Sequence, residues 1–205
     1  HPSVLTLALM LAAELRRLRR EAAATEELAA ASLALANEHG LSLFSAVTGL
    51  LRGWAQVEQG KLEEGIAGLR RSLDAYQAIG ADSGLPQYLA MLAEAHARAG
   101  QTAEGLEAVG QALEVIDRTD ERWWEADLYR LRGELMLAAS ASLTEAESCF
   151  LQAIEVARAK FQTIPGIALV DGALVGRMGV AGYDPMRIVL DVRGQGLLTG
   201  VKLGV

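Results

Sequence analysis

The 205-residue chain contains a single cysteine, Cys149, so an intramolecular disulfide is excluded. We expect Cys149 to be a small buried side chain in a helix. A protein without disulfide bonds is typical of a reducing compartment, which predicts a cytoplasmic location. Aromatic residues make up only 5% of the sequence, whereas 51% of the residues are hydrophobic. This balance favours Ala- and Leu-rich helix packing over a β-sandwich.

Long hydrophobic runs are also missing. The longest early apolar run covers residues 4–13, and a bilayer-spanning helix needs about 20 apolar residues. The arginines follow this run, which is the reverse of the order in a signal peptide. We therefore expect no membrane partner. Because the sequence begins with His1 and not with methionine, we also expect it to be part of a longer protein.

The sequence also lacks clusters of metal-ligating residues and an overall excess of basic residues. The three histidines are scattered without ligand spacing, so the sequence predicts no metal and no cofactor. The net charge is −7, and residues 1–161 are the acidic part, with 15 Lys and Arg against 23 Asp and Glu. An acidic domain is poorly suited to a phosphate backbone. Nucleic acid is therefore not an expected partner of this region.

What the chain does have is a repeat. Gly60, Gly100 and Ser140 are spaced 40 residues apart, and the three segments that follow them are similar: GKLEEGIAGLRRSLDAY, GQTAEGLEAVGQALEVI and SASLTEAESCFLQAIEV. A period of this size is typical of a stacked solenoid of helical hairpins. Such arrays bind other molecules more often than they catalyse reactions.

Small and larger apolar residues recur within each segment at helical offsets of four, seven and eight. The aligned sets are Gly65, Gly105 and Ala146; Leu69, Val109 and Phe150; Ser72, Ala112 and Ala153; and Leu73, Leu113 and Ile154. Upstream, Gly53, Ala93 and Gly133 recur at the same spacing in a preceding helical segment. Each unit is thus predicted to be a pair of antiparallel helices. The predicted helical domain covers residues 1–161, with hairpins at about 1–41, 42–80, 81–119 and 120–161.

These positions resemble the tetratricopeptide repeat, which has small residues near the middle of the first helix and at two places in the second. The usual period is about 34 residues, so the helices or connections here are longer. The runs LRGWAQVEQGKLEEGIAGLRRSL, LAMLAEAHARAGQTAEGLEA and ERWWEADLYRLRGEL resemble the tetratricopeptide region at the C-terminal end of large bacterial signalling ATPases, of the nucleotide-cyclase or transcriptional-regulator type. The resemblance implies an all-α, tetratricopeptide-like α-solenoid with a role in signal transduction.

The character changes in residues 162–205, which carry nine glycines in 44 residues and short β-branched runs. We expect a Gly-rich, non-repeat tail of short strands and irregular turns. Residues 182–200 resemble a segment of the pyridoxal-phosphate-dependent Orn/Lys/Arg decarboxylases, but the Ser-x-His-Lys cofactor motif is missing. Two arrangements stay open: the tail caps the last repeat by lying across Leu151, Ile154 and Val156, or it is an undocked appendage.

The first helix of each hairpin lines the concave side of such a stack, so its projecting residues are the candidate binding surface. A tryptophan beside a row of mixed charge suits a peptide with apolar and basic groups. The alternative, that these residues complete packing and solvation between repeats, stays open. The candidate partner-binding groove consists of Trp54, Glu58, Gln87, Met91, Glu94, Arg98, Asp127, Arg130 and Glu134, with Val47 and Leu50 beside them.

The sequence therefore predicts a non-enzymatic, protein-binding regulatory domain of a larger bacterial signalling protein, with a protein or peptide partner. Asp127 and Glu134 lie seven apart on one helix face, and we interpret them as surface carboxylates, not as an acid/base pair. Of Trp123 and Trp124, we expect one to pack against the preceding hairpin and the other to be partly exposed. Two alternatives remain: a fragment of a decarboxylase fusion without its catalytic residues, and a structural array that self-associates.

Overall fold

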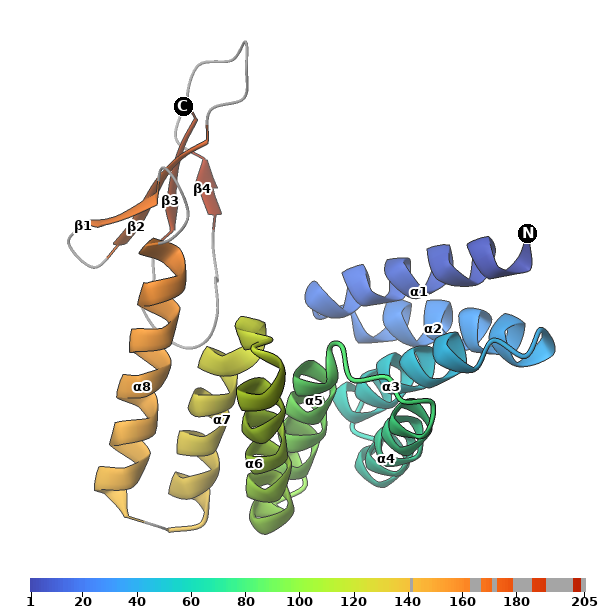
Figure 1. Cartoon of the computed structure of the whole chain (residues 1–205), viewed down its shortest axis with the longest axis horizontal. Helices are drawn as coiled ribbons and strands as arrows, with labels where there is room; N and C mark the ends of the chain where they lie inside the picture. The colour runs from blue at the N-terminus through green and yellow to red at the C-terminus, as the bar shows by residue number, and fades with distance from the viewer. Residues whose placement is uncertain (141, 163–166, 171–172, 179–185, 191–200, 204–205) are drawn as a thin grey trace. The chain divides into compact units, whose positions relative to one another are not determined.

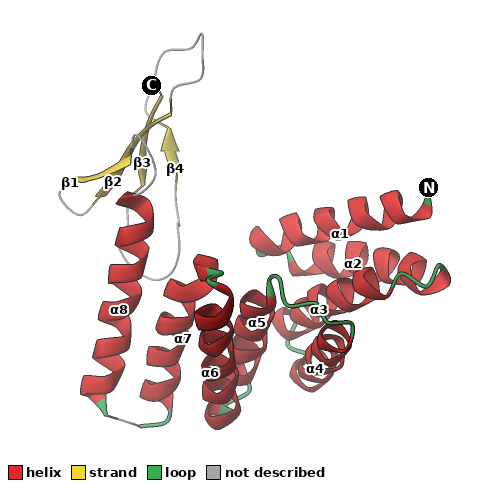
Figure 2. Cartoon of the chain, viewed as in Figure 1, coloured by secondary structure: helices red, strands yellow, loops and turns green. Residues whose placement is uncertain are grey.

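The chain folds into helices followed by short strands (Figures 1 and 2). The computed structural model describes residues 1–140, 142–162, 167–170, 173–178, 186–190 and 201–203, and side chains as far as residue 160. Within these residues there are eight α-helices, one short 3-10 helix and four β-strands. The elements are α1 (Pro2–Leu18), α2 (Ala22–Glu38), α3 (Ser42–Glu58), α4 (Leu62–Ala78), α5 (Leu85–Arg98), α6 (Thr102–Thr119), η1 (Arg122–Trp124), α7 (Glu125–Ala138), α8 (Leu143–Gln162), β1 (Ile167–Val170), β2 (Ala173–Met178), β3 (Met186–Leu190) and β4 (Val201–Leu203).

The chain divides into two compact units, His1–Phe150 and Leu151–Val205, and α8 contains the boundary between them. The first unit contains α1 to α7 and the start of α8. These are consecutive helices joined by short turns, as the sequence predicts for an all-α repeat array. The helical region ends at Gln162, next to the predicted boundary at residue 161. The division into domains 1–161 and 162–205 stays a prediction.

A left-handed residue ends each helix of the first unit at a regular interval. The backbone φ is positive at Arg20, Gly40, Gly60, Gly80, Gly100, Asp120 and Ser140, so the turns repeat every 20 residues. At one of them, the N–H of Gly60 donates to the carbonyl of Val57 (3.0 Å) and that of Lys61 to the carbonyl of Gln56 (2.9 Å), which is a Schellman motif. The 40-residue period of the sequence therefore contains two helices, and a left-handed residue follows each of α1 to α7.

Small residues let the two helices of a hairpin approach closely, as the repeat pattern predicts. A Cβ added to Gly53 in α3 would lie 2.9 Å from the backbone nitrogen of Leu69 and 3.0 Å from the carbonyl oxygen of Gly65 in α4. The same holds in the last hairpin, where a Cβ on Gly133 would come within 2.8 Å of the Phe150 ring. The predicted small positions of both helices are thus confirmed as contact points.

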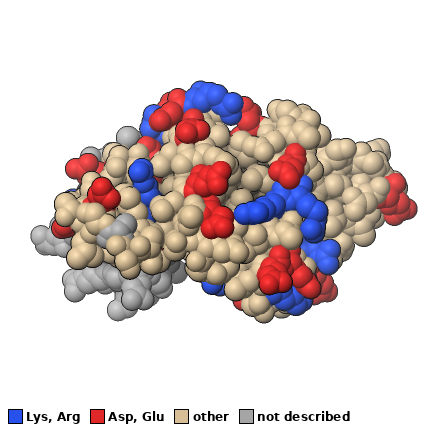
Figure 3. All heavy atoms as spheres, turned by 90° about the horizontal axis from the view of Figure 1, so that it is seen from below, with Lys and Arg blue, Asp and Glu red and all other residues tan. Residues whose placement is uncertain are grey.

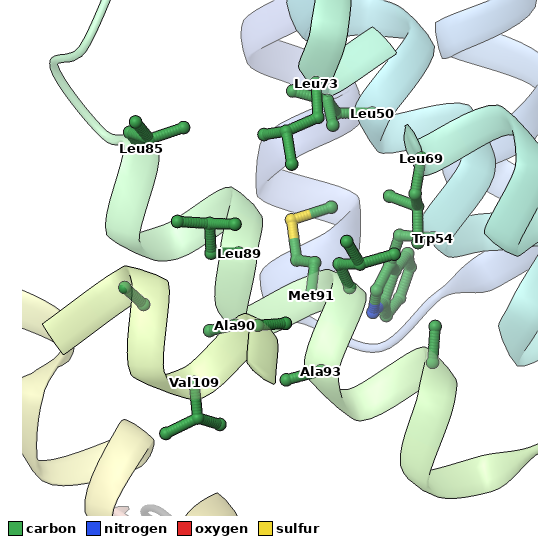
Figure 4. Close-up of a cluster of buried hydrophobic side chains, with 14 of the residues drawn as sticks. Leu50, Trp54, Leu69, Leu73, Leu85, Leu89, Ala90, Met91, Ala93 and Val109 are labelled. Atoms are coloured by element: carbon green, nitrogen blue, oxygen red, sulfur yellow. The ribbon is translucent and has the colours of Figure 1, made fainter. Parts of the chain in front are cut away.

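The hydrophobic core runs without interruption from α3 to α7 (Figure 4). Leu69 and Val109, the larger apolar residues of the repeat, are completely buried in it. Cys149 on α8 is 8% exposed, and its Sγ lies 3.8 Å from the Sδ of Met136. The prediction of a buried cysteine in a helix is therefore confirmed.

In the second unit, the four strands form one antiparallel sheet in the order β1-β2-β3-β4. Ile167 lies opposite Gly176, and Val189 of β3 lies opposite Lys202 of β4. Short strands in the tail were expected. Of the decarboxylase-like stretch 182–200, only 186–190 falls within the described residues. The tail side chains predicted to cover α8 also lie outside them; Leu151 and Ile154 on α8 are 57% and 46% exposed.

No helix among the described residues is both long and apolar enough to cross a membrane.

Candidate peptide-binding groove

An ion-pair network joins the C-terminal ends of three first helices, and it contains three of the predicted groove residues. Nη1 of Arg20, directly after α1, donates to Oε1 of Glu58 on α3 and to Oε1 of Glu94 on α5, both at 3.1 Å. Nη2 of Arg98 donates to the same Glu58 oxygen at 2.8 Å. We call Arg20, Glu58, Glu94 and Arg98 the Arg20 network. Two guanidiniums and two carboxylates from three successive hairpins therefore meet at one place.

The Arg20 network lies at the surface. The side chain of Arg20 is 59% exposed and that of Arg98 38%, while Glu58 and Glu94 are 16% and 25% exposed. Burial acts to lower the pKa of Arg20, but the charges and hydrogen bonds of Glu94 and Glu58 outweigh it and raise the pKa. Exposed ion pairs each contribute about 0–1 kcal/mol to folding. These groups are therefore able to exchange their present partners for those of a ligand at small cost.

A second cluster lies next to it and is largely closed to solvent. Arg17 on α1 is only 8% exposed, and its Nε and Nη2 donate to the two carboxylate oxygens of Glu14 at 2.8 and 2.7 Å. The guanidinium carbon lies 5.9 Å from the ring centre of Trp54 and 5.8 Å from that of Trp124. Nε2 of Gln87 donates to Glu14 at 2.8 Å. We call Glu14, Arg17, Trp54, Gln87 and Trp124 the Arg17 cluster.

The two tryptophans at the start of the fourth hairpin have different surroundings. Trp123 is 83% exposed, whereas Trp124 is partly buried against the hydrophobic core and contacts Arg17. Their different exposures confirm the expectation that one packs and the other faces solvent.

On α7, the remaining three predicted residues form a local group of their own. Arg130 donates from Nη1 to Glu134 at 2.6 Å and from Nε to Asp127 at 2.9 Å. Burial acts to lower the pKa of Arg130, but the charge of Asp127 and the hydrogen bonds to both carboxylates raise it. Each carboxylate thus has a guanidinium partner, and the interpretation of Asp127 and Glu134 as surface carboxylates stays a prediction.

Trp54 and Met91 differ from the sequence prediction, which placed them on the groove surface. Their side chains are 3% and 4% exposed, and Leu50 beside them is completely buried (Figure 4). The reason is that a first helix contacts its own partner helix and the neighbouring hairpins, so that the open part of its surface is narrower than the predicted face. For Trp54 and Met91, the alternative of packing between repeats is the correct one in this structure.

The sequence prediction did not include Glu14, Arg17, Arg20 and Trp124, which lie beside the predicted groove residues. The arginines at the end of α1 were used in the sequence analysis only as an argument against a signal peptide. A signal was present, because Glu14 lies one 40-residue period before Trp54, a predicted groove position. What the period does not reveal is that the end of α1 reaches α5 and η1.

Acidic and basic side chains are mixed over the face of the molecule shown in Figure 3. No patch of a single sign dominates that view. Among the described residues, no three His, Cys, Asp or Glu side chains are grouped in a way that could hold a metal ion.

The first unit is a tetratricopeptide-like helical repeat, and comparison with known proteins agrees with this class. BtubC (BKLC) from P. vanneervenii superimposes with a TM-score of 0.65 at 17% identity, over 90% of this chain and 72% of that one. Bacillus thuringiensis PlcR, solved in complex with the peptide PapR7 and DNA, superimposes with a TM-score of 0.52 at 16% identity, over 79% of this chain and 70% of that one. At these identities the likeness shows the fold alone.

No protein-family model matches the chain. An uncharacterised protein of Rhizobium meliloti (strain 1021) is 28% identical over 137 residues, which are 67% of this chain. The matched stretch is only 13% of that relative's length.

Proposed function

We propose that the first unit is a non-enzymatic regulatory domain that binds a peptide or an extended protein segment. The ligand would lie along the Arg20 network and along Asp127, Arg130 and Glu134 of α7. The observation that carries this proposal is the meeting of Glu58, Glu94 and Arg98 with Arg20 at an exposed place on three successive hairpins. Charged groups that are held by neighbours and still reach solvent are suited to recognising a polar ligand.

The ligand that fits best carries basic side chains. Along this surface, four carboxylates (Glu58, Glu94, Asp127 and Glu134) accompany three guanidiniums. A Lys or Arg of the ligand would correct that imbalance by pairing with Glu94 or with the half-exposed Glu134. The peptide in the PlcR structure supports a peptide as the class of ligand, while the DNA there stays a property of PlcR.

The cellular setting is part of the proposal. A cytoplasmic, bacterial signalling protein is the context that the resemblance to the C-terminal region of signalling ATPases implies. Helical repeats usually serve such proteins as interaction modules.

A peptide selection tests this function directly. Random 12-residue peptides displayed on phage are selected on the whole chain, and synthetic copies of the enriched peptides are titrated by fluorescence anisotropy. We expect enrichment in Lys and Arg, and binding about tenfold weaker to Glu94→Gln, because one charge-assisted hydrogen bond is lost. Glu104→Gln is the matched control, since Glu104 is an exposed residue of α6. Equal binding to the chain and to Glu94→Gln would show that the groove assignment is wrong.

A further inference from the structure

The first helix carries an exposed apolar stripe. Leu11 and Leu15 on α1 are 56% and 59% exposed, and Val4 and Leu18 on the same face are 64% and 59% exposed. These residues recur at intervals of seven, four and three, so they form one continuous line along the helix. A helix with such a stripe is normally covered by another element. We call Val4, Leu11, Leu15 and Leu18 the α1 stripe.

The repeat register shows what covers this face elsewhere in the chain. The residues one, two and three periods after Leu11 are Leu51, Met91 and Leu131, which are 1%, 4% and 2% exposed. The residues that correspond to Leu15 are Ala55, Ala95 and Leu135, and none of them is more than 1% exposed. The same positions are thus buried in all three later hairpins.

Three contacts, two between α2 and α3 and one between α6 and α7, identify the covering element as the preceding hairpin. Leu51 on α3 packs in one cluster with Ala29 of α2. Thr48, which corresponds to Ala8 of α1, hydrogen-bonds to the hydroxyl of Ser32 on α2 at 3.2 Å.

The third contact comes from the last hairpin. A Cβ on Gly105 of α6 would lie 2.8 Å from a methyl group of Leu135, so this leucine packs closely against the preceding second helix. In each case, the second helix of one hairpin presents small residues to this face of the next first helix.

We propose that the α1 stripe is a docking surface for a further helical hairpin of the same kind, whose second helix places small residues against Leu11 and Leu15. Leu11 and Leu15 are the register-equivalents of residues that are buried in all three later hairpins, and at α3 and α7 the preceding second helix is the element in contact. Leu11 and Leu15 are not members of the Arg20 network, so this assignment does not depend on the proposed function.

A tandem variant tests the proposal with a hairpin of known surface. An additional copy of residues 2–41 is placed directly before Pro2, so that the copied α2 precedes α1 as α2 now precedes α3. We expect a more stable protein and slower hydrogen exchange of α1, since the stability of repeat arrays grows with each interface between neighbours. Leu11→Glu in the original α1 should lower the folded-to-unfolded ratio of the tandem variant by at least about tenfold, because it buries an unpaired charge.

Leu11→Glu in the chain without the added hairpin shows whether the loss of stability depends on that hairpin. There Leu11 is exposed, so Leu11→Glu should change the ratio by less than about twofold. Leu43→Glu, at a 46% exposed leucine of α3, is the matched control and should be nearly neutral in both backgrounds. If Leu11→Glu is equally mild in both, or if the added hairpin stays unfolded, the proposal is overturned. A concentration-dependent dimer in sedimentation velocity that Leu11→Glu dissociates and Leu43→Glu does not would also overturn it, in favour of a second copy.

Discussion

The guanidinium carbon of Arg17 lies 5.8 Å from the ring centre of Trp124, although Arg17 belongs to the first hairpin and Trp124 to the last. Trp54 presents a second ring at 5.9 Å, so the cation rests against two aromatic groups. In a repeat array, each hairpin normally contacts only its neighbours. The Arg17 cluster is therefore a long-range connection between the first and last hairpins of the first unit.

Arg17→Met should destabilise the first unit by about 2 kcal/mol, because a desolvated cation–π contact and a bidentate pair with Glu14 are lost together. The measurement is urea denaturation followed by far-UV circular dichroism. Arg19→Met is the control, since Arg19 is 63% exposed and pairs only with Glu21, so we expect less than about 0.5 kcal/mol. Equal effects of the two substitutions would contradict the structural importance of Arg17.

Trp124→Ala should cost about 2 kcal/mol or more of unfolding free energy, because its ring packs against the hydrophobic core and against Arg17. Trp123→Ala removes the same side chain one residue earlier. Since Trp123 is 83% exposed, that change should cost less than about 0.5 kcal/mol. Thermal and urea denaturation of the two variants, side by side, check the difference; a larger loss at Trp123 would mean that the roles are reversed.

The repeat pattern alone predicted the local architecture well, because helix packing requires specific residue sizes at specific places. Gly53 and Gly133 were expected to be contact points, and both lie too close to a neighbouring helix to carry a Cβ. The 20-residue spacing of the turns was harder to detect. Arg20, Asp120 and Ser140 adopt the left-handed conformation without being glycine, so composition does not reveal them.

The contacts among the predicted groove residues followed from the sequence only in part, for a reason of geometry. A register states which residues of successive helices are equivalent, and in the structure Arg98 pairs with both Glu58 and Glu94. The register does not give the rotation from one hairpin to the next. That rotation decides that Trp54 is buried and that Arg20 reaches both Glu58 and Glu94.

Gly53→Ala should destabilise the protein by about 2 kcal/mol, because the added methyl group meets backbone atoms of α4 that cannot move independently. Gly110→Ala is the matched control on α6, where an added Cβ meets nothing within 4 Å. There the higher helix propensity of alanine should stabilise the protein by up to about 1 kcal/mol. Opposite shifts of the urea midpoint are expected, and two shifts of the same sign would contradict the close approach of α3 and α4.

Ser140→Gly should stabilise the protein by about 0.5 kcal/mol, because serine pays for its left-handed backbone and glycine does not, although glycine also loses more entropy on folding. The φ of Ser140 is 56°, and its N–H donates to the carbonyl of Leu137 at 3.1 Å, as that of Gly60 does to the carbonyl of Val57. Gly60→Ala makes the opposite kind of change at an equivalent turn. The φ of Gly60 is 83°, and no atom lies within 4 Å of an added Cβ. This substitution should therefore cost about 1 kcal/mol through the backbone alone. Differential scanning calorimetry of both variants checks the signs, and a destabilised Ser140→Gly would show that residue 140 does not end its helix in the left-handed conformation.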